Sequence, residues 1–293
     1  MTGQVEGYEH ERHQWAERKR AVGGGRPYAH SLVVRVALVL TYLRLHVPQE
    51  VVGLLYGCSQ SDVSRELRRM VPLISRMLPV PEIWQLSQDE PEGVGVDELP
   101  IACLSDGRAL IDATEQRISR SVDPSTRDAH YSGKRKAFTL KTQLVTDGQH
   151  HIHAMSVAVP GRVHDKTLAD EVDTIQRLPD GVEALLDKGY QGLAQQVDLL
   201  PDGDGTPVPA FTLKIPFKKP KGKDLSAQQK VFNHDLSAIR VHIEHCIGWL
   251  KNWAILANRF RCDHAIYTPI FQLVCGLVNA QTYRWQSSLS YCA

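Results

Sequence analysis

Residues 233–258 read NHDLSAIRVHIEHCIGWLKNWAILAN. Apolar side chains recur in this stretch at helical spacing and no proline interrupts it, so it is predicted to form a long amphipathic helix. Arg240, Glu244 and Lys251 fall within about 60° of one another on the surface of that helix. This face is either a solvated ladder of ion pairs, each contributing about 0.3 kcal/mol, or a metal-binding carboxylate between two cations that contact phosphate.

The composition is that of an ordinary globular protein. A chain of 293 residues holds one large or two smaller domains, and 42% hydrophobic residues are enough to build a core. The net charge of +1 does not by itself indicate a nucleic-acid partner, because dedicated DNA-binding domains are often far more basic. The charge is segregated, however: residues 85–98 contain acids without Lys or Arg, and residues 214–223 contain five lysines without an acid.

The cysteines and the apolar runs indicate a reduced compartment and no membrane span. The six cysteines are scattered and form no C-x-x-C pair, which favours core thiols over disulfides or zinc. The polar, charged start of the chain is unlike a signal peptide. The apolar run over residues 32–45 contains Arg35 and Arg44 and is too short to cross a bilayer. We therefore expect a cytoplasmic protein.

Residues 29–79 show a pattern typical of a helix-turn-helix. A helical run over residues 32–43 is followed by one that starts at Pro48 and stops at Gly57, and Ser59 with Asp62 then forms a capping-box pattern at the start of a third helix. The third helix would lie in the major groove of DNA. Its candidate contacts with bases or phosphates are Gln60, Ser61, Ser64, Arg65, Arg68 and Arg69. The alternative is a plain helical hairpin with a solvated arginine face.

The remaining chain alternates strand and helix patterns. Strands are expected at residues 94–96, 101–104, 108–112, 138–146, 151–159, 182–187 and 210–216, with a helix over residues 163–178. Asp147-Gly148 lies between two alternating runs and predicts a hairpin turn. We expect a polar segment at residues 1–28, a helix-turn-helix domain at 29–80, an acidic proline-containing linker at 81–93, an α/β domain at 94–285 and a tail at 286–293.

Three carboxylates are candidates for one site. Asp112 and Asp187 each end an apolar strand, and strand ends of an α/β sheet tend to converge. Glu244 on the long helix would complete the set. Because three converging carboxylates repel one another, divalent cations are the natural reason for such a cluster, and oxygen ligands favour Mg²⁺ or Mn²⁺.

Four stretches of this second domain resemble the DDE superfamily of transposases and endonucleases, in particular the insertion-sequence-five and Harbinger-like branch. They are LIDATEQRI around Asp112, PGRVHDKTL around Asp165, LLDKGYQGL around Asp187 and RVHIEHCIGWLK around Glu244. The resemblance implies a ribonuclease-H-like fold, a mixed α/β sheet flanked by helices, preceded by an all-α helix-turn-helix domain. It also implies Asp112, Asp187 and Glu244 as catalytic metal ligands for two divalent ions.

The family signature near the last acid is Tyr, two residues, Arg, three residues, Glu, six residues, Lys. Arg240, Glu244 and Lys251 fit this spacing, whereas Ser237 stands at the tyrosine position. The departure affects any role of that tyrosine, such as contact with the cleaved strand end, and leaves the three acids in place. Arg240 and Lys251 are then expected to contact phosphate.

The resemblance implies an insertion-sequence transposase that cuts double-stranded DNA at terminal inverted repeats and joins the ends to target DNA, acting as a homodimer. The alternatives are a DNA-binding regulator that has lost nuclease activity and a host-adopted endonuclease that no longer transposes.

The remaining candidates have simpler interpretations. Asp165 is expected at a helix start or in support of the metal ligands, with direct contact to metal as the alternative. His150, His151 and His153 are expected on a solvated hairpin turn, with a metal site as the alternative. In the lysine run, Lys218, Lys219 and Lys221 are expected to bind the DNA backbone, with a solvated loop as the alternative.

Overall fold

The computed structural model describes residues 28–89, 104, 106–197, 199–201, 207–209 and 211–290. The chain divides into two compact units, Met1–Leu78 and Pro79–Ala293, which are described separately. Residues 1–27 of the expected polar segment and the expected strands at residues 94–96 and 101–103 lie outside the described residues, and Leu104 is not in a strand.

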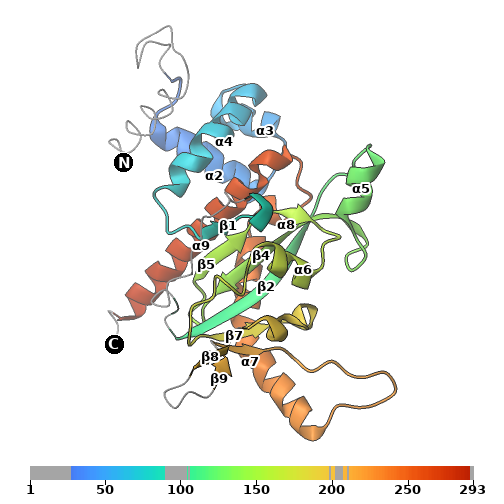
Figure 1. Ribbon diagram of the computed structural model, residues 1–293. Helices are drawn as coiled ribbons and strands as arrows, with labels where there is room; N and C mark the ends of the chain where they lie inside the picture. The colour runs from blue at the N-terminus through green and yellow to red at the C-terminus, as the bar shows by residue number, and fades with distance from the viewer. Residues whose placement is uncertain are drawn as a thin grey trace. The chain divides into compact units, whose positions relative to one another are not determined.

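The described part of the first unit is helical, as predicted. It contains α2 (Leu32–Leu45), α3 (Gln49–Tyr56) and α4 (Gln60–Ser75) (Figure 1). The Ser59–Asp62 capping box is present, with each side chain accepting from the other residue's backbone N–H. Helix α3 ends at Gly57, whose φ of 67° is a conformation that glycine adopts without strain.

The turn between α3 and α4 is closely packed. A Cβ atom on Gly53 would lie 2.5 Å from the carbonyl oxygen of Cys58, so only glycine fits at this position. A nearly buried ion pair of 2.8 Å joins Arg35 of α2 to Glu66 of α4. These contacts fix the three helices around a core that includes Leu38 and Leu67.

A mixed sheet forms the centre of the second unit. Its main strands are β1 (Glu82–Trp84), β5 (Ile152–Ser156), β4 (Ala137–Thr146), β2 (Arg108–Arg117), β7 (Glu183–Leu186) and β10 (Thr212–Lys214), in that spatial order. The predicted hairpin is present: β2, β4 and β5 form an antiparallel meander, and β7 and β10 run parallel to β2. The short strands β3 (Tyr131–Ser132) and β6 (Val159–Pro160) pair with β4, and β8 (Leu199–Pro201) pairs with β9 (Pro207–Pro209).

Helices cover both faces of this sheet. Ala109 and Ile111 of β2 join a core cluster that includes Leu168 of α6 (Asp165–Glu171). Residues at even positions of β2 face the other way: Gln116 donates to the carbonyls of Ile255 and Asn258, at and just beyond α8 (Ala254–Ala257). On this side α7 (Ala227–Lys251) packs on β2 and β7, and α9 (Tyr267–Ser290) packs on β5 and α7.

A short helix, α5 (Pro124–His130), lies beyond the end of β2 (Figure 1). The predicted ribonuclease-H-like mixed sheet flanked by helices is therefore confirmed.

Several predicted boundaries are wrong. The expected linker at residues 81–93 contains β1, which pairs with β5 and buries Trp84 completely. The expected helix over residues 163–178 extends only from Asp165 to Glu171. The long helix starts earlier than expected, because Ser226 and Gln229 form a capping box there. It ends at Lys251, because the extended backbone of Trp253 starts a new turn. The expected tail begins inside α9, which continues to Ser290.

Candidate active site

Asp112 and Asp187 lie side by side on neighbouring strands. Strands β2 and β7 are parallel, and Ile111 is in register with Leu186. The next residue on each strand is an aspartate, so the two carboxylates occupy equivalent positions about 5 Å apart along the hydrogen-bonding direction. Asp187 directly follows its strand as predicted, whereas Asp112 lies inside a strand that continues to Arg117.

Arg240 of α7 joins the two aspartates. Its guanidinium donates from Nη2 to Asp112 Oδ2 at 3.1 Å and from Nη1 to Asp187 Oδ1 at 3.3 Å. The Arg240 side chain is only 9% exposed, against 22% for Asp112 and 35% for Asp187. This arrangement differs from the expected phosphate contact, because the arginine neutralises the carboxylates of its own site.

Asp112 is electrostatically strained in this setting. Burial raises the pKa of its carboxyl group to about 6, and the charges of Asp187 and Asp165 act in the same direction. The Arg240 guanidinium and the backbone N–H of Ala113 lower the pKa, but they do not offset the burial. A further cation beside Asp112 would therefore be stabilised by the site.

Glu244 does not join this cluster directly. It lies one turn after Arg240 on α7 and is exposed. Within the described part of the chain, the three predicted metal ligands do not place one oxygen each within 4.8 Å of one another. Arg240 is the α7 residue that contacts the two aspartates, and the role of Glu244 as a metal ligand stays a prediction.

Asp165 lies at the first position of α6 and forms a nearly buried ion pair of 2.7 Å with Lys141 of β4. The Lys141 ammonium also donates to the carbonyl of Val163. Gly189 packs against Asp165 so closely that a Cβ there would lie 2.6 Å from Oδ2. Because Lys141 already neutralises Asp165, this carboxylate has a partner of its own, and its supporting role stays a prediction.

Lys251 connects α7 to the sheet. Its ammonium donates to the carbonyl of Leu256 at 2.8 Å and to that of Glu115 on β2 at 3.3 Å. Burial lowers its pKa to about 8, and the charge of Arg135 acts in the same direction. Lys251 therefore has structural contacts in addition to the phosphate contact that the sequence predicts.

A basic pocket of about 800 Å³ lies against β2, β4 and the start of α6 and was not predicted as a site; Asp112 and Asp187 are not among its lining residues. Its wall includes Glu115, three residues after Asp112, and Gly189, two residues after Asp187. It also includes the ion pair of Lys141 with Asp165. The cations that line the rest of it come from the segment between β2 and β4 and from the loop before α6: Arg120, Arg127, Lys134 and Arg162. The basic composition of residues 117–141 is the sequence signal that would have located it.

The predicted DNA-contacting residues of α4 are mostly accessible. Gln60, Ser61, Arg65 and Arg68 are exposed. Arg69 is half-buried and pairs with Glu66 at 3.3 Å, so its charge is already paired within the first unit. Ser64 is half-buried.

The predicted lysines before α7 are also exposed. Lys219 pairs with Asp224 at 2.8 Å, and Lys218 and Lys221 extend from the same loop. Asn233 of α7 holds this loop by hydrogen bonds to the backbone N–H and carbonyl of Phe217. The lysines are therefore tied to the helix that carries Arg240.

Comparison with protein families matches residues 111–279 to the DDE superfamily endonucleases. The chain belongs to this family. The match includes Asp112, Asp187 and Glu244, and residues 31–79 match the helix-turn-helix of DDE superfamily endonucleases.

This DDE endonuclease is similar to a curated protein from Microchaete diplosiphon described as a probable transposase for insertion sequence element IS702. The two are 28% identical over 273 residues, which cover 90% of this chain and 85% of the relative. One similar solved structure is a Mos1 transposase paired-end complex with the left transposon end, at 12% identity over 95% of this chain and 85% of that chain. Another is a pre-cleavage Mos1 transpososome, at 13% identity over 96% of this chain and 84% of that chain. Both have a TM-score of 0.25, which is too low to carry an argument.

Cys58, Cys246, Cys262 and Cys275 are free thiols. Among the described residues, no helix combines the length and apolarity needed to cross a membrane.

Proposed function

We propose that this chain is the transposase of an insertion sequence, a divalent-metal-dependent enzyme that cuts DNA at the element ends and joins them to target DNA. The observation that carries the proposal is the placement of Asp112 and Asp187 directly after the in-register pair Ile111 and Leu186 of β2 and β7, with Arg240 bound to both carboxylates. The likeness to a probable insertion-sequence transposase over 90% of the chain supports it.

The residues present fit a divalent cation. Asp112 and Asp187 offer oxygen ligands, and the burial that raises the pKa of Asp112 makes a nearby cation favourable. Asp112, Asp187 and Glu244 would hold Mg²⁺ or Mn²⁺, two ions in the full arrangement, with Asp165 supporting them. Such ions, when bound, stabilise the attacking and leaving oxygens of a displacement at phosphorus.

Arg240 has a part in assembling this site. It holds the two aspartates together at 3.1 and 3.3 Å and so balances their mutual repulsion. With a divalent cation held by the aspartates, the Arg240 guanidinium would be available to bind a phosphate oxygen of the DNA, for which its planar geometry is suited. Lys251, whose pKa is lowered by burial, gives a second cation on the same helix face.

The DNA would contact several basic surfaces. Residues Gln60, Ser61, Arg65 and Arg68 on the exposed side of α4 would recognise the terminal inverted repeats. The basic pocket would bind the backbone next to the cleaved bond, and Lys218, Lys219 and Lys221 would bind phosphates further along the strand. A water oxygen would attack the phosphorus at the element end and break its bond to the 3′ oxygen, which leaves as a 3′-hydroxyl. That hydroxyl would then attack a target phosphodiester and displace a 3′-hydroxyl of the target strand. Two copies would pair the two ends.

Cleavage of DNA that carries the element's own terminal repeats tests the proposal. The full-length chain is incubated with a labelled duplex containing the inverted repeats that flank its gene, with Mg²⁺ or Mn²⁺. Wild type is expected to release a 3′-hydroxyl at the repeat end, and Asp187→Asn and Glu244→Gln are expected to lose at least about a hundredfold in rate. Asp180→Asn, which removes an exposed carboxylate before the start of β7, at the other end of that strand from Asp187, serves as the matched control.

The outcomes separate the alternatives. Equal cleavage by wild type and Asp187→Asn contradicts the assignment of the site. Specific binding of the repeats without metal-dependent cleavage identifies a DNA-binding regulator instead. Cleavage without joining to a target duplex identifies an endonuclease that no longer transposes. Mass photometry of the DNA complex tests whether two copies pair the ends.

A further inference from the structure

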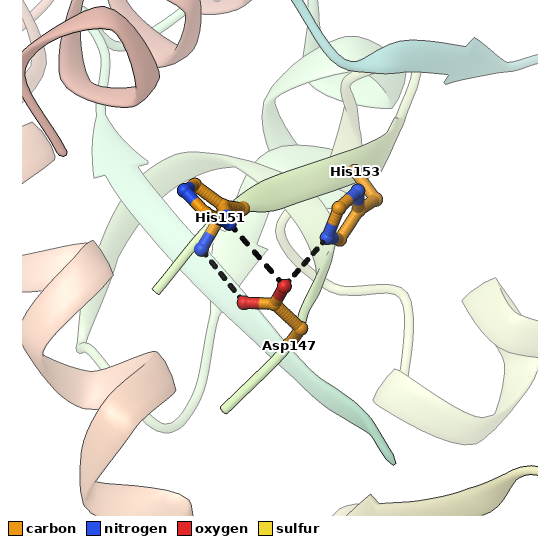
Figure 2. A group of neighbouring side chains, drawn as sticks. All are labelled: Asp147, His151 and His153. Carbon is orange, nitrogen blue, oxygen red and sulfur yellow. Dashed lines mark hydrogen bonds and ion pairs between the residues drawn. The ribbon is translucent and has the colours of Figure 1, made fainter. Parts of the chain in front are cut away.

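A second cluster of potential metal ligands lies at the turn between β4 and β5. It consists of Asp147, directly after β4, together with His151 and His153 on the returning strand (Figure 2). The sequence predicts a solvated turn here, and that prediction is wrong. The Asp147 side chain is 0% exposed, and those of His151 and His153 are 7% and 12% exposed. A buried carboxylate and two nearly buried imidazoles need a physical reason, because burying a charge is costly unless it is paired.

The backbone brings both imidazoles to the same carboxylate oxygen. His150 has a φ of 69°, which turns the chain back after Asp147. His151 and His153 are two residues apart, so their side chains lie on the same face of the returning strand. Figure 2 shows both rings directed at Asp147, with Oδ2 between His151 Nδ1 at 3.3 Å and His153 Nε2 at 3.1 Å.

These separations match those between ligand atoms around a tetrahedral zinc ion. With zinc–nitrogen and zinc–oxygen bonds of about 2.1 Å, two ligands of a tetrahedral site are about 3.4 Å apart. The three candidate atoms all lie within 4.8 Å of one another, so one ion can contact all of them. Two imidazoles and one carboxylate favour zinc over Mg²⁺, which prefers oxygen ligands.

The candidate ligands are held in place by the surrounding structure. The second oxygen of Asp147, Oδ1, accepts the backbone N–H groups of Gln149 and His151, both at 2.9 Å. The His151 ring stacks on Tyr283 of α9, with centroids 4.2 Å apart. The next residue, Ile152, exchanges backbone hydrogen bonds with the side chain of Asn279, also on α9. Ligands fixed in this way lose little freedom on binding a metal.

We propose that Asp147, His151 and His153 bind one Zn²⁺ ion, with water as the fourth ligand, and that this ion fixes the β4–β5 turn against α9. The site is separate from the one that contains Asp112: its ligands are mainly nitrogen atoms and come from one hairpin. Its role is structural, because it stabilises the sheet on which β2 is paired. It does not depend on the proposed function.

Zinc binding to the full-length chain tests this proposal directly. The protein is stripped with a chelator, and Zn²⁺ is titrated by calorimetry in excess Mg²⁺, which saturates sites built from oxygen ligands. Wild type is expected to bind one zinc per chain in this range and to unfold at a higher temperature with zinc. His153→Gln is expected to bind zinc at least about tenfold more weakly and to lose the thermal shift. His150→Gln, the neighbouring histidine outside the cluster, is expected to behave as wild type.

X-ray absorption at the zinc edge of the wild-type protein gives an answer that does not depend on any variant folding. Two imidazoles and one carboxylate in the coordination shell support the site. Three results overturn it: no zinc bound to wild type, equal affinity in His150→Gln and His153→Gln, or a shell with fewer than two imidazoles. In each of these cases the imidazoles donate hydrogen bonds to Asp147 without an ion.

Discussion

Replacing Arg240 with methionine removes the cation that joins Asp112 to Asp187. We expect Arg240→Met to lower the free energy of unfolding by about 3 kcal/mol when divalent cations are chelated. The same substitution is expected to increase the affinity for Mn²⁺, because the arginine and the metal compete for the same carboxylates. A less stable protein that binds metal more tightly is an unusual combination, and it follows directly from the position of Arg240.

The magnitude follows from the geometry. Each ion pair, at 3.1 and 3.3 Å between nitrogen and oxygen, has a Coulomb energy of about 5 kcal/mol at an effective dielectric constant of about 20. Removing one partner of a buried pair costs about 3–5 kcal/mol, because the remaining charge is left unpaired. Asp187 is 35% exposed and solvent screens part of its charge, which places the expected loss at the lower end of that range.

Urea denaturation with a chelator, and again with increasing Mn²⁺, measures both effects. Arg108→Met is the matched control, because Arg108 of β2 pairs with Glu183 of β7 across the same two strands. That pair is 43% and 26% exposed, so its loss should cost less than about 1 kcal/mol and leave Mn²⁺ affinity unchanged. Mn²⁺ at about 100 times its dissociation constant should restore about 2.7 kcal/mol to Arg240→Met.

Arg240 does not stabilise the aspartate pair if Arg240→Met and Arg108→Met lower stability by the same small amount with chelator present. The expected competition between Arg240 and metal is refuted if Arg240→Met binds Mn²⁺ no more tightly than wild type. Arg240→Lys, which keeps the charge but not the two-pronged geometry, should fall between wild type and methionine.

Three further predictions concern single residues. Lys251 has a pKa of about 8 in the folded protein against 10.5 in the unfolded chain, so the unfolded state binds more protons between these pH values. Urea denaturation should therefore show wild type gaining stability relative to Lys251→Met as the pH rises from about 8 to 10.5. A constant difference in stability across that range contradicts the lowered pKa. Gly53→Ala should lower the thermal stability of the helix-turn-helix by about 1–3 kcal/mol and weaken repeat binding, because its Cβ would meet the backbone of Cys58 at 2.5 Å. Gly248→Ala, in α7 with no atom within 4 Å of its Cβ position, should raise stability by about 0.5–1 kcal/mol; a loss would reveal a contact at that face.

Local sequence patterns were sufficient to predict the structure where it depends on residues that are neighbours in the chain. The helices of the first unit follow from apolar spacing, Gly57 and the Ser59–Asp62 capping box. The β4–β5 hairpin follows from Asp147-Gly148 between alternating runs. Asp187 follows its strand as expected, because a buried apolar run that ends in a charge marks the edge of a sheet.

Local patterns failed where distant packing decides the outcome. A strand of three residues has too few positions to show alternation, so the sequence does not distinguish β1 from a linker, and only its pairing with β5 identifies it as a strand. The polar sequence around His151 indicates a turn in water, but α9 covers it, with Tyr283 stacked on the ring.

The stretch at residues 233–258 shows the same division. By itself the sequence determined that a long amphipathic helix forms and that Arg240, Glu244 and Lys251 share one of its faces, because helical periodicity fixes relative angles. Only the tertiary structure decided which of them meets the aspartates. The register of β2 with β7 and the packing of α7 across them place Arg240 between Asp112 and Asp187, and leave Glu244 exposed one turn further along. Contacts between elements distant in sequence depend on how those elements pack, and periodicity within one helix carries no information about that packing.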